Sequence, residues 1–175
     1  MSRVHINKLA MIEMVERNTK TAFNKIGNGL VEKVRSSMSA GSGKTYKRKG
    51  ELAHVASSPG RPPAPWSGRL HDSITFRTSF GQKSSMGGRA KPGDEINEPK
   101  GAMGGYALSV GSNVPYALSM EKGQKRNKVA ARPYLWPALA GSRGLIKEAF
   151  TFPYYMQVID GRQRSHRNLE LLQGK

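Results

Sequence analysis

An apolar stripe between Asn7 and Met38 is the feature that most limits how this chain can fold. Its members recur mostly three or four positions apart, and Thr19 fills the gap in the series. They are Leu9, Ile12, Val15, Phe23, Ile26, Leu30, Val34 and Met38. This spacing predicts one long amphipathic helix whose stripe packs into a core or against another helix. Gly27 and Gly29 weaken it near the middle and indicate a kink or a point of close packing.

The segment after this helix, residues 39–69, is small and basic at first and then rich in proline. Pro59, Pro62, Pro63 and Pro65 exclude a helix or an inner strand. We therefore expect an extended structural connector, with Trp66 as its large anchor. A proline-rich ligand for a signalling domain is the alternative.

Two half-buried strands are predicted farther along the chain. Apolar and polar side chains alternate from Leu70 to Phe80, and Tyr106, Leu108 and Val110 share one face of a second segment. Residues 81–105 between them contain many glycines and charges of both signs, so we expect a flexible loop there.

Two short helices and a tail complete the expected order. Asn113 and Pro115 predict a helix that runs to Met120, and Pro137 predicts the start of a second one. Residues 154–159, "YYMQVI", are a candidate strand.

The charge of the chain points to an anionic partner. Lys and Arg number 29 against 12 Asp and Glu, which gives a formal charge of +17. Such a charge attracts three classes of partner: nucleic acid, an acidic protein surface or an anionic membrane. The alternative is that the charge only keeps the protein soluble.

The absence of cysteine excludes disulfides and thiolate metal sites and fits a reducing cytoplasm. No signal core or membrane-spanning run is present, so we expect a soluble protein.

Three clusters of basic residues lie in segments expected to be loops. The first is Lys44, Lys47, Arg48 and Lys49; the second is Lys122, Lys125, Arg126, Lys128 and Arg132; the third is Arg162, Arg164, His166 and Arg167. Each can contact phosphates without reading bases, or can simply be solvated. Tyr46 could stack on a base, but a single aromatic residue is a weak signal.

No catalytic, cofactor-binding or metal site is predicted. Gly43-Lys44-Thr45 matches only the end of a phosphate-binding loop, because Met38 stands where that loop requires glycine and a helix precedes it. The sequence His71-Asp72-Ser73 lies on a predicted strand, where neighbouring side chains point to opposite faces and cannot relay a proton. The remaining histidines lack metal-ligand spacing. We therefore expect that the protein is not an enzyme.

Three ordered motifs resemble a known family. Gly68-Arg69-Leu70 with Ser73-Ile74 matches a "GRL..SI" motif. Residues 110–116 with Glu121 and Gly123 match "VGSNVPYA...E.G", and residues 131–139 match "ARPFL.PAL" with tyrosine at the phenylalanine position. Together, over about residues 1–150, they are similar to the neck or tail-completion proteins of tailed bacteriophages, the head-tail joining group often labelled minor tail components.

This resemblance implies an α+β fold in which a long N-terminal helix and a C-terminal helix pack on a small antiparallel β-sheet with long loops. It implies one domain over residues 1–152 and an extension over 153–175. The implied function is structural: a ring, expected to have six copies, that joins the head connector or stopper to the tail terminator or tail tube around the DNA channel of the virion. Genomic DNA is an expected partner, a membrane is not, and assembly takes place in the host cytoplasm. A free basic nucleic-acid-binding protein is the alternative.

The resemblance also assigns fold roles to the matched residues. These are Gly68, Arg69, Leu70, Pro115, Tyr116, Glu121, Arg132, Pro133, Tyr134 and Pro137. Tyr116 is expected to point to the core, and Glu121 to meet a basic group for which Arg132 is the candidate. Pro133 and Pro137 should fix the start of the last helix, with Tyr134 and Leu135 buried beneath it.

Overall fold

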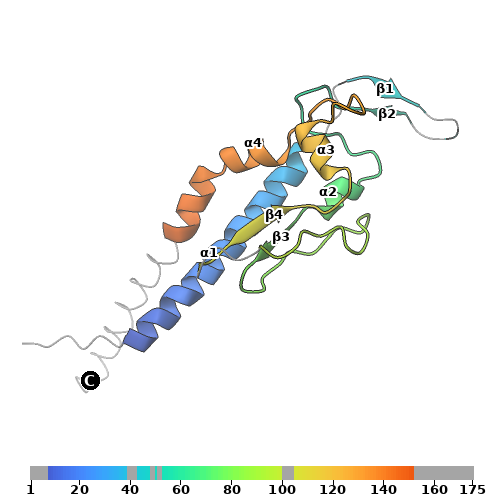
Figure 1. Cartoon of the computed structure of the whole chain (residues 1–175). Helices are drawn as coiled ribbons and strands as arrows, with labels where there is room; N and C mark the ends of the chain where they lie inside the picture. The colour runs from blue at the N-terminus through green and yellow to red at the C-terminus, as the bar shows by residue number, and fades with distance from the viewer. Residues whose placement is uncertain (1–7, 39–42, 48–49, 51–52, 100–104, 152–175) are drawn as a thin grey trace, which may run out of the picture. The chain divides into compact units, whose positions relative to one another are not determined.

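The structure, a computed structural model, describes residues 8–38, 43–47, 50, 53–99 and 105–151. In chain order its elements are α1 (Lys8–Ser37), β1 (Thr45–Tyr46), β2 (His54–Val55), α2 (Arg69–Ser73), β3 (Thr75–Thr78), β4 (Leu108–Gly111), α3 (Ala117–Lys122) and α4 (Leu135–Ala140). Residues 143–151 are also helical. Figure 1 shows these elements, and they confirm the predicted α+β class.

The chain divides into two compact units, and α1 contributes to both. One unit is Gly27–Arg143, and the other combines Met1–Ile26 with Gly144–Lys175. The single domain expected over residues 1–152 and the extension over 153–175 stay predictions. The candidate strand at 154–159 and the third basic cluster, Arg162, Arg164, His166 and Arg167, lie outside the described residues.

The long N-terminal helix is confirmed by α1. Within the unit Gly27–Arg143 the predicted stripe is buried at Leu30 and Val34, and at Met38 just after the helix. In the other unit, Leu9, Ile12 and Val15 of the stripe are exposed, so the predicted packing is wrong for them. A Cβ atom at Gly27 would lie 2.6 Å from carbons of the buried Phe76 ring, so this glycine is a point of close packing. At this point α1 packs against β3, which carries Phe76.

The predicted first strand is only partly right. Residues Arg69–Ser73 form the short helix α2, and the strand β3 begins at Thr75. Gly68 has a φ of 75°, which glycine adopts at no steric cost and which turns the chain into α2. The second predicted strand corresponds to β4, which pairs antiparallel with β3, with Thr75 opposite Gly111 and Thr78 opposite Leu108.

A cluster of buried side chains holds this unit together. It draws on α1, α2, β3, α3, α4 and the flanking residues. Its members are Val31, Val34, Met38, Leu70, Ile74, Phe76, Val114, Ala117, Tyr134 and Ala138. Leu108, Val110 and Leu135 pack against it, so the two strands and α4 share this core.

The connector contains a small hairpin that the sequence did not predict. β1 and β2 pair antiparallel, and the Gly43 amide donates to the Ala56 carbonyl at 2.7 Å. Thr45 lies in a strand, opposite Val55. This backbone pairing replaces the phosphate-wrapping turn that the Gly43-Lys44-Thr45 sequence would need, which supports rejecting that motif.

In the other unit, two helical segments run antiparallel. Lys25 Nζ lies 2.7 Å from Glu148 Oε1, and the Phe23 and Phe150 rings meet edge to face at 6.0 Å. Ala149 is fully buried in this unit.

Among the described helices of the whole chain, none has the length and apolar character needed to cross a membrane.

Two buried aspartates organise residues 81–99 of the loop between β3 and β4. Asp72 accepts from the Arg89 guanidinium at 2.8 and 3.0 Å, and Asp94 accepts from Arg69 at 2.7 and 2.8 Å. The Lys91 amide also donates to Asp94, at 2.8 Å. The flexibility expected for 81–105 stays a prediction, but these contacts tie its 81–99 part to α2.

We predict that the Arg69–Asp94 pair makes stability fall in acid. Hydrogen bonds from Arg69 lower the pKa of Asp94 from 3.8 to about 2. A carboxylate whose pKa is lower in the folded state adds stability above its unfolded pKa, and this is lost as the pH falls through the folded pKa. The unfolding temperature should therefore drop as the pH falls from about 4 to about 2.

Asp94→Asn tests this dependence. The variant should unfold at a lower temperature at pH 7, and its unfolding temperature should change less with pH below 4. The slope should shrink without vanishing, because Arg89 also lowers the pKa of Asp72. Glu98→Gln, at an exposed side chain, is the control. An unchanged acid slope in Asp94→Asn would contradict the assignment.

Candidate functional site

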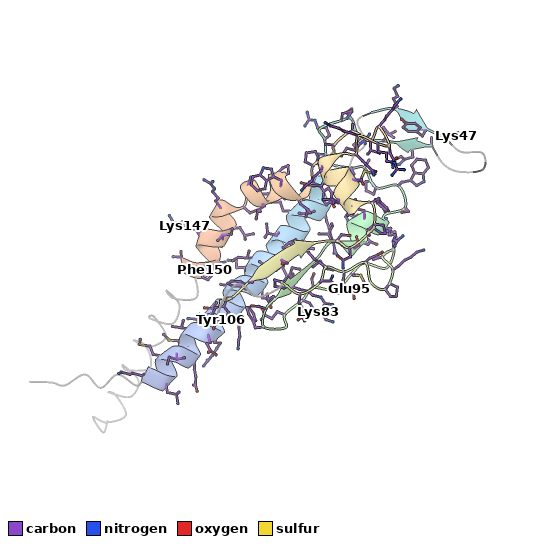
Figure 2. The ribbon with its side chains drawn as sticks, in the orientation of Figure 1. Lys47, Lys83, Glu95, Tyr106, Lys147 and Phe150 are labelled. Carbon is purple, nitrogen blue, oxygen red and sulfur yellow. The ribbon has the colours of Figure 1, made fainter. Side chains whose placement is uncertain are left out.

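Two of the three basic clusters meet at one end of the unit Gly27–Arg143. The hairpin β1–β2 carries Lys44 and Lys47, and the end of α3 with the loop after it carries the second cluster. The two segments are joined where they leave the core: the Gly60 amide donates to the Ala131 carbonyl at 2.9 Å, and Arg132 Nε donates to the Ser57 carbonyl at 3.2 Å. Figure 1 shows this loop beside β1 and β2, and Figure 2 labels Lys47 on the hairpin.

The loop after α3 is built to expose its cations. Gln124 and Val129 exchange two backbone hydrogen bonds, of 2.8 and 3.0 Å, which close the loop between them. Lys128 has a φ of 52°, in the left-handed region that non-glycine residues seldom adopt. Lys125, Arg126 and Lys128 are all exposed. These three and Lys44 and Lys47 form what we call the basic end; Arg48 and Lys49 lie outside the described residues.

The predicted pairing of Glu121 with Arg132 is wrong. The Glu121 carboxylate instead accepts from three backbone amides at the start of α4: Tyr134 at 2.8 Å, Leu135 at 3.0 Å and Trp136 at 3.0 Å. Arg132 donates to the carbonyls of Ser57 and Ala130. The first amides of a helix lack acceptors within the helix and attract negative charge, so a carboxylate is well placed there.

The helix starts also differ from the prediction. α3 begins at Ala117, and its N-cap is Tyr116, with no side-chain cap from Asn113 or any other residue. α4 begins at Leu135, so Pro137 lies within its first turn and does not start it. Proline is tolerated there because first-turn amides have no partner in the helix.

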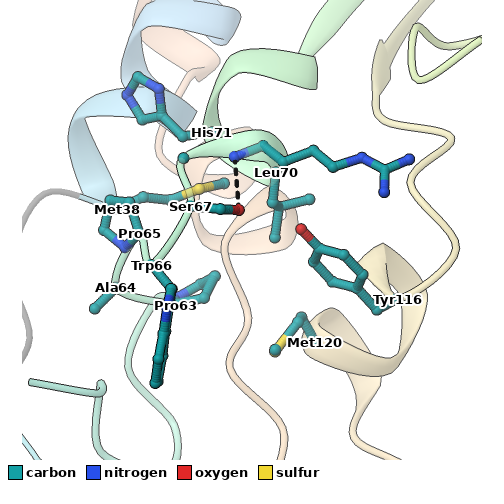
Figure 3. A pocket seen from close by; sticks show the side chains of 12 residues that line it. Met38, Pro63, Ala64, Pro65, Trp66, Ser67, Leu70, His71, Tyr116 and Met120 are labelled. Carbon is teal, nitrogen blue, oxygen red and sulfur yellow. Dashed lines mark hydrogen bonds between the residues drawn. The ribbon is translucent and has the colours of Figure 1, made fainter. Parts of the chain in front are cut away.

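The prediction that Tyr116 points to the core is wrong, whereas the burial of Tyr134 is confirmed. Tyr134 is 1% exposed, and its hydroxyl donates to the Ala117 carbonyl at 3.3 Å. Tyr116 is 37% exposed and lines an apolar hollow of about 280 Å³ with Met38, Leu70 and Met120. In Figure 3 it stands across this hollow from Trp66. Tyr134 already fills the core space beneath α3, which leaves Tyr116 at the surface.

The His71-Asp72-Ser73 sequence does not form a proton relay. These residues lie on a helix, so the strand geometry first used to reject the relay is wrong, and His71 Nδ1 does lie 2.8 Å from Asp72 Oδ1. Asp72, however, is held by Arg89, which keeps the pKa of its carboxyl well below the ordinary value. The buried Ser73 hydroxyl bonds to the Leu70 carbonyl and the Ser112 hydroxyl. No histidine therefore contacts the hydroxyl, among the described residues.

The described ranges contain no recognisable metal site. No group of three or more histidine and carboxylate side chains lies close enough to hold an ion there. That the protein is not an enzyme stays a prediction.

Three large apolar side chains of α3 and α4 are exposed to solvent near the point where Glu121 caps α4. Leu118 is 65% exposed, Trp136 is 69% exposed and Leu139 is 47% exposed. Trp136 and Leu139 are three positions apart on α4 and share a face. Leu118 lies one turn before Glu121, whose carboxylate binds the Trp136 amide. We call these three residues the α3–α4 patch. The patch was not predicted, because the "ARPYLWPAL" segment does not indicate which side of α4 is buried.

Comparison of the chain with protein-family models, with curated proteins and with solved structures found no match.

Proposed function

We propose that this protein is a structural component of the neck or upper tail of a tailed bacteriophage. Copies of the chain assemble into a ring, expected to be sixfold, around the DNA channel of the virion. One side of the ring meets the head connector or stopper, and the other meets the tail terminator or tail tube. Its action is geometric, because it matches two surfaces and holds them together.

The observation that carries this proposal is that hydrogen bonds connect the three motifs that resemble the family. Arg69 from the first motif binds Asp94, which in turn accepts from Lys91 and through its carbonyl from the Asn113 amide of the second motif. Glu121 from the second motif caps α4 in the third. The matched residues therefore hold the three motifs together, which supports the structural role expected for a joining protein.

The α3–α4 patch supplies a surface for self-association. Exposed apolar side chains that gather in one place commonly mark a protein–protein interface, and tryptophan is enriched at interface hot spots. Leu139 is a matched position of the third motif, and Trp136 stands at the unspecified position within it. The basic end would then face the DNA or an acidic neighbour in the stack.

We predict that Trp136→Glu prevents ring assembly. The side chain is 69% exposed, so the variant should fold, but a carboxylate cannot be buried at a subunit contact without a partner. Self-association measured by mass photometry or sedimentation should weaken by roughly 30-fold or more, the loss typical of a hot spot. Trp136→Phe should retain assembly. An unchanged oligomer in Trp136→Glu would remove the patch from the proposal.

Location tests the function itself. Electron cryomicroscopy of intact particles should place the chain between the head connector and the tail tube. Density for this protein elsewhere in the particle, or its absence from particles, would defeat the proposal whatever the oligomeric state in solution.

The basic end favours the second candidate, a free nucleic-acid-binding protein. That function predicts tight binding by the isolated protein, with affinity that falls steeply as salt rises. The neck function predicts at most weak binding that does not depend on sequence. A salt series of duplex-binding measurements, run with the self-association experiment, separates the two.

A further inference from the structure

We propose that a pocket beside the hairpin β1–β2 binds an unpaired nucleobase of a single-stranded nucleic acid. This goes beyond the proposed function, which requires only that duplex DNA pass through a ring. It also does not depend on that function, since the pocket lies within a single copy of the chain.

Three aromatic rings from the connector between α1 and α2 form the walls of the pocket. Tyr46 on β1 lies directly opposite His54 on β2. The His54 ring packs on the Trp66 ring with centroids 4.5 Å apart at 42°, which helps to fix the indole. Tyr46 is 51% exposed and Trp66 is 50% exposed, so both remain accessible to a ligand. Exposed aromatic rings are the surfaces on which single-stranded nucleic acids stack their bases.

The space between these rings is small and mostly apolar. It measures about 270 Å³, just below the roughly 300–1,000 Å³ of pockets for drug-sized ligands, so it suits one ring system. Pro63, Ala64 and Met120 contribute its apolar surface.

Two polar groups in this pocket distinguish it from a purely apolar groove. Ser57 is 4% exposed, and its Oγ atom has no hydrogen-bond partner among the described residues. The Arg132 guanidinium also lines the pocket, held there by Nε and Nη1 bonds to the carbonyls of Ser57 and Ala130. A buried hydroxyl without a partner is uncommon in native proteins and calls for an explanation. The edge of a nucleobase, which carries both donors and acceptors, supplies the missing partner.

The surrounding charge favours a base attached to phosphates over an aromatic side chain from a protein partner. None of the described residues that line the pocket is acidic. Lys44 lies two positions before Tyr46, directly before β1, and is exposed. The loop with Lys125, Arg126 and Lys128 is joined to the pocket through Arg132 and Ala131. A base inside a duplex is stacked and paired, so the pocket selects unpaired strands.

Fluorescence of Trp66 gives a direct test. In a Trp136→Phe background Trp66 is the single tryptophan of the chain. A short oligothymidine should quench it, and an abasic oligonucleotide of the same length should bind roughly 5- to 150-fold more weakly, the loss expected for one stacked base. The full-length protein at low salt is the sample, because phosphate contacts add to the affinity there.

Variants separate stacking from charge. Tyr46→Ala should lower affinity for oligothymidine by a similar factor and leave abasic binding unchanged, whereas Tyr46→Phe should keep both. Ser57→Ala should cause a smaller loss for oligothymidine only. Lys125→Ala is the matched control, and it should weaken binding of the two oligonucleotides equally because it acts on phosphates.

Equal binding of the normal and abasic strands would overturn the assignment, as would full affinity in Tyr46→Ala. Quenching by a tyrosine-containing peptide but not by oligothymidine would also overturn it and assign the pocket to a protein partner. None of these outcomes bears on where the protein sits in a particle, so the proposed function is judged separately.

Discussion

Glu121→Ala should lower the free energy of unfolding by about 3 kcal/mol, the upper part of the range for a hydrogen bond to a charged group. The partly buried carboxylate accepts from three consecutive amides at the start of α4, at 2.8 to 3.0 Å. Alanine leaves these donors without an acceptor, at the point where the helix dipole favours negative charge. Chemical denaturation followed by circular dichroism measures the change.

Two variants make this result specific. Glu121→Gln keeps one acceptor oxygen but no charge, so its loss should lie between that of alanine and zero. Glu32→Ala removes an exposed glutamate from α1 and should change stability by less than about 0.5 kcal/mol. If Glu121→Ala were as mild as Glu32→Ala, the carboxylate would not be the cap of α4. Because α4 carries Trp136 and Leu139, the same variant should also weaken self-association.

Gly27→Leu should destabilise the protein by roughly 3 kcal/mol, the upper part of the usual cost of overpacking a core. A Cβ atom at this position would lie 2.6 Å from carbons of the Phe76 ring, and Phe76 is fully buried. The ring is enclosed by the core and cannot move aside as the end of an exposed side chain could. The gain from replacing a helical glycine, about 1 kcal/mol, is too small to offset this cost.

Gly144→Leu is the matched control for Gly27→Leu. Gly144 also lies in a helical stretch, residues 143–151, but a Cβ atom there would meet nothing within 4 Å. This variant should leave stability unchanged or raise it by up to about 1 kcal/mol, since only the helix propensity changes. Thermal and denaturant unfolding of both variants gives the comparison. A Gly27→Leu protein as stable as Gly144→Leu would show that α1 does not pack closely on Phe76.

The helix α1 was predictable because it depends on local periodicity. The spacing of Leu30, Val34 and Met38 gives one helical face whatever surrounds it, and these residues are buried as predicted. Leu9, Ile12 and Val15 of the same stripe are exposed, because periodicity defines a face but does not supply the segment that covers it. The segment from Leu70 to Phe80 was harder, because Leu70 and Ile74 are four positions apart and fit either a strand or one turn of helix. Gly68 with its positive φ was the local signal for the turn into α2.

The candidate sites depended on contacts between distant residues. Tyr46 was noticed in the sequence as a single aromatic residue near lysines, but His54, Ser57, Trp66 and Arg132 joined it only in the structure. No rule of spacing links these positions, since a two-stranded pairing and a loop-to-loop hydrogen bond bring them together. The same holds for Glu121, whose partners are backbone amides and so leave no mark in the side-chain sequence.

The sequence by itself determined the long amphipathic helix and the strong positive charge, because periodicity and composition are properties of the chain alone, and the resemblance of its motifs implied the α+β class. Only the tertiary structure decided which charges and rings meet. It paired Arg69 with Asp94 and Arg89 with Asp72, and it placed Glu121 at the start of α4. It also placed Tyr46 and Trp66 around one pocket. Hydrogen bonds and packing between distant segments depend on where the chain turns. Turns such as the one at Gly68 and the hairpin β1–β2 bring these segments together only when the whole core forms.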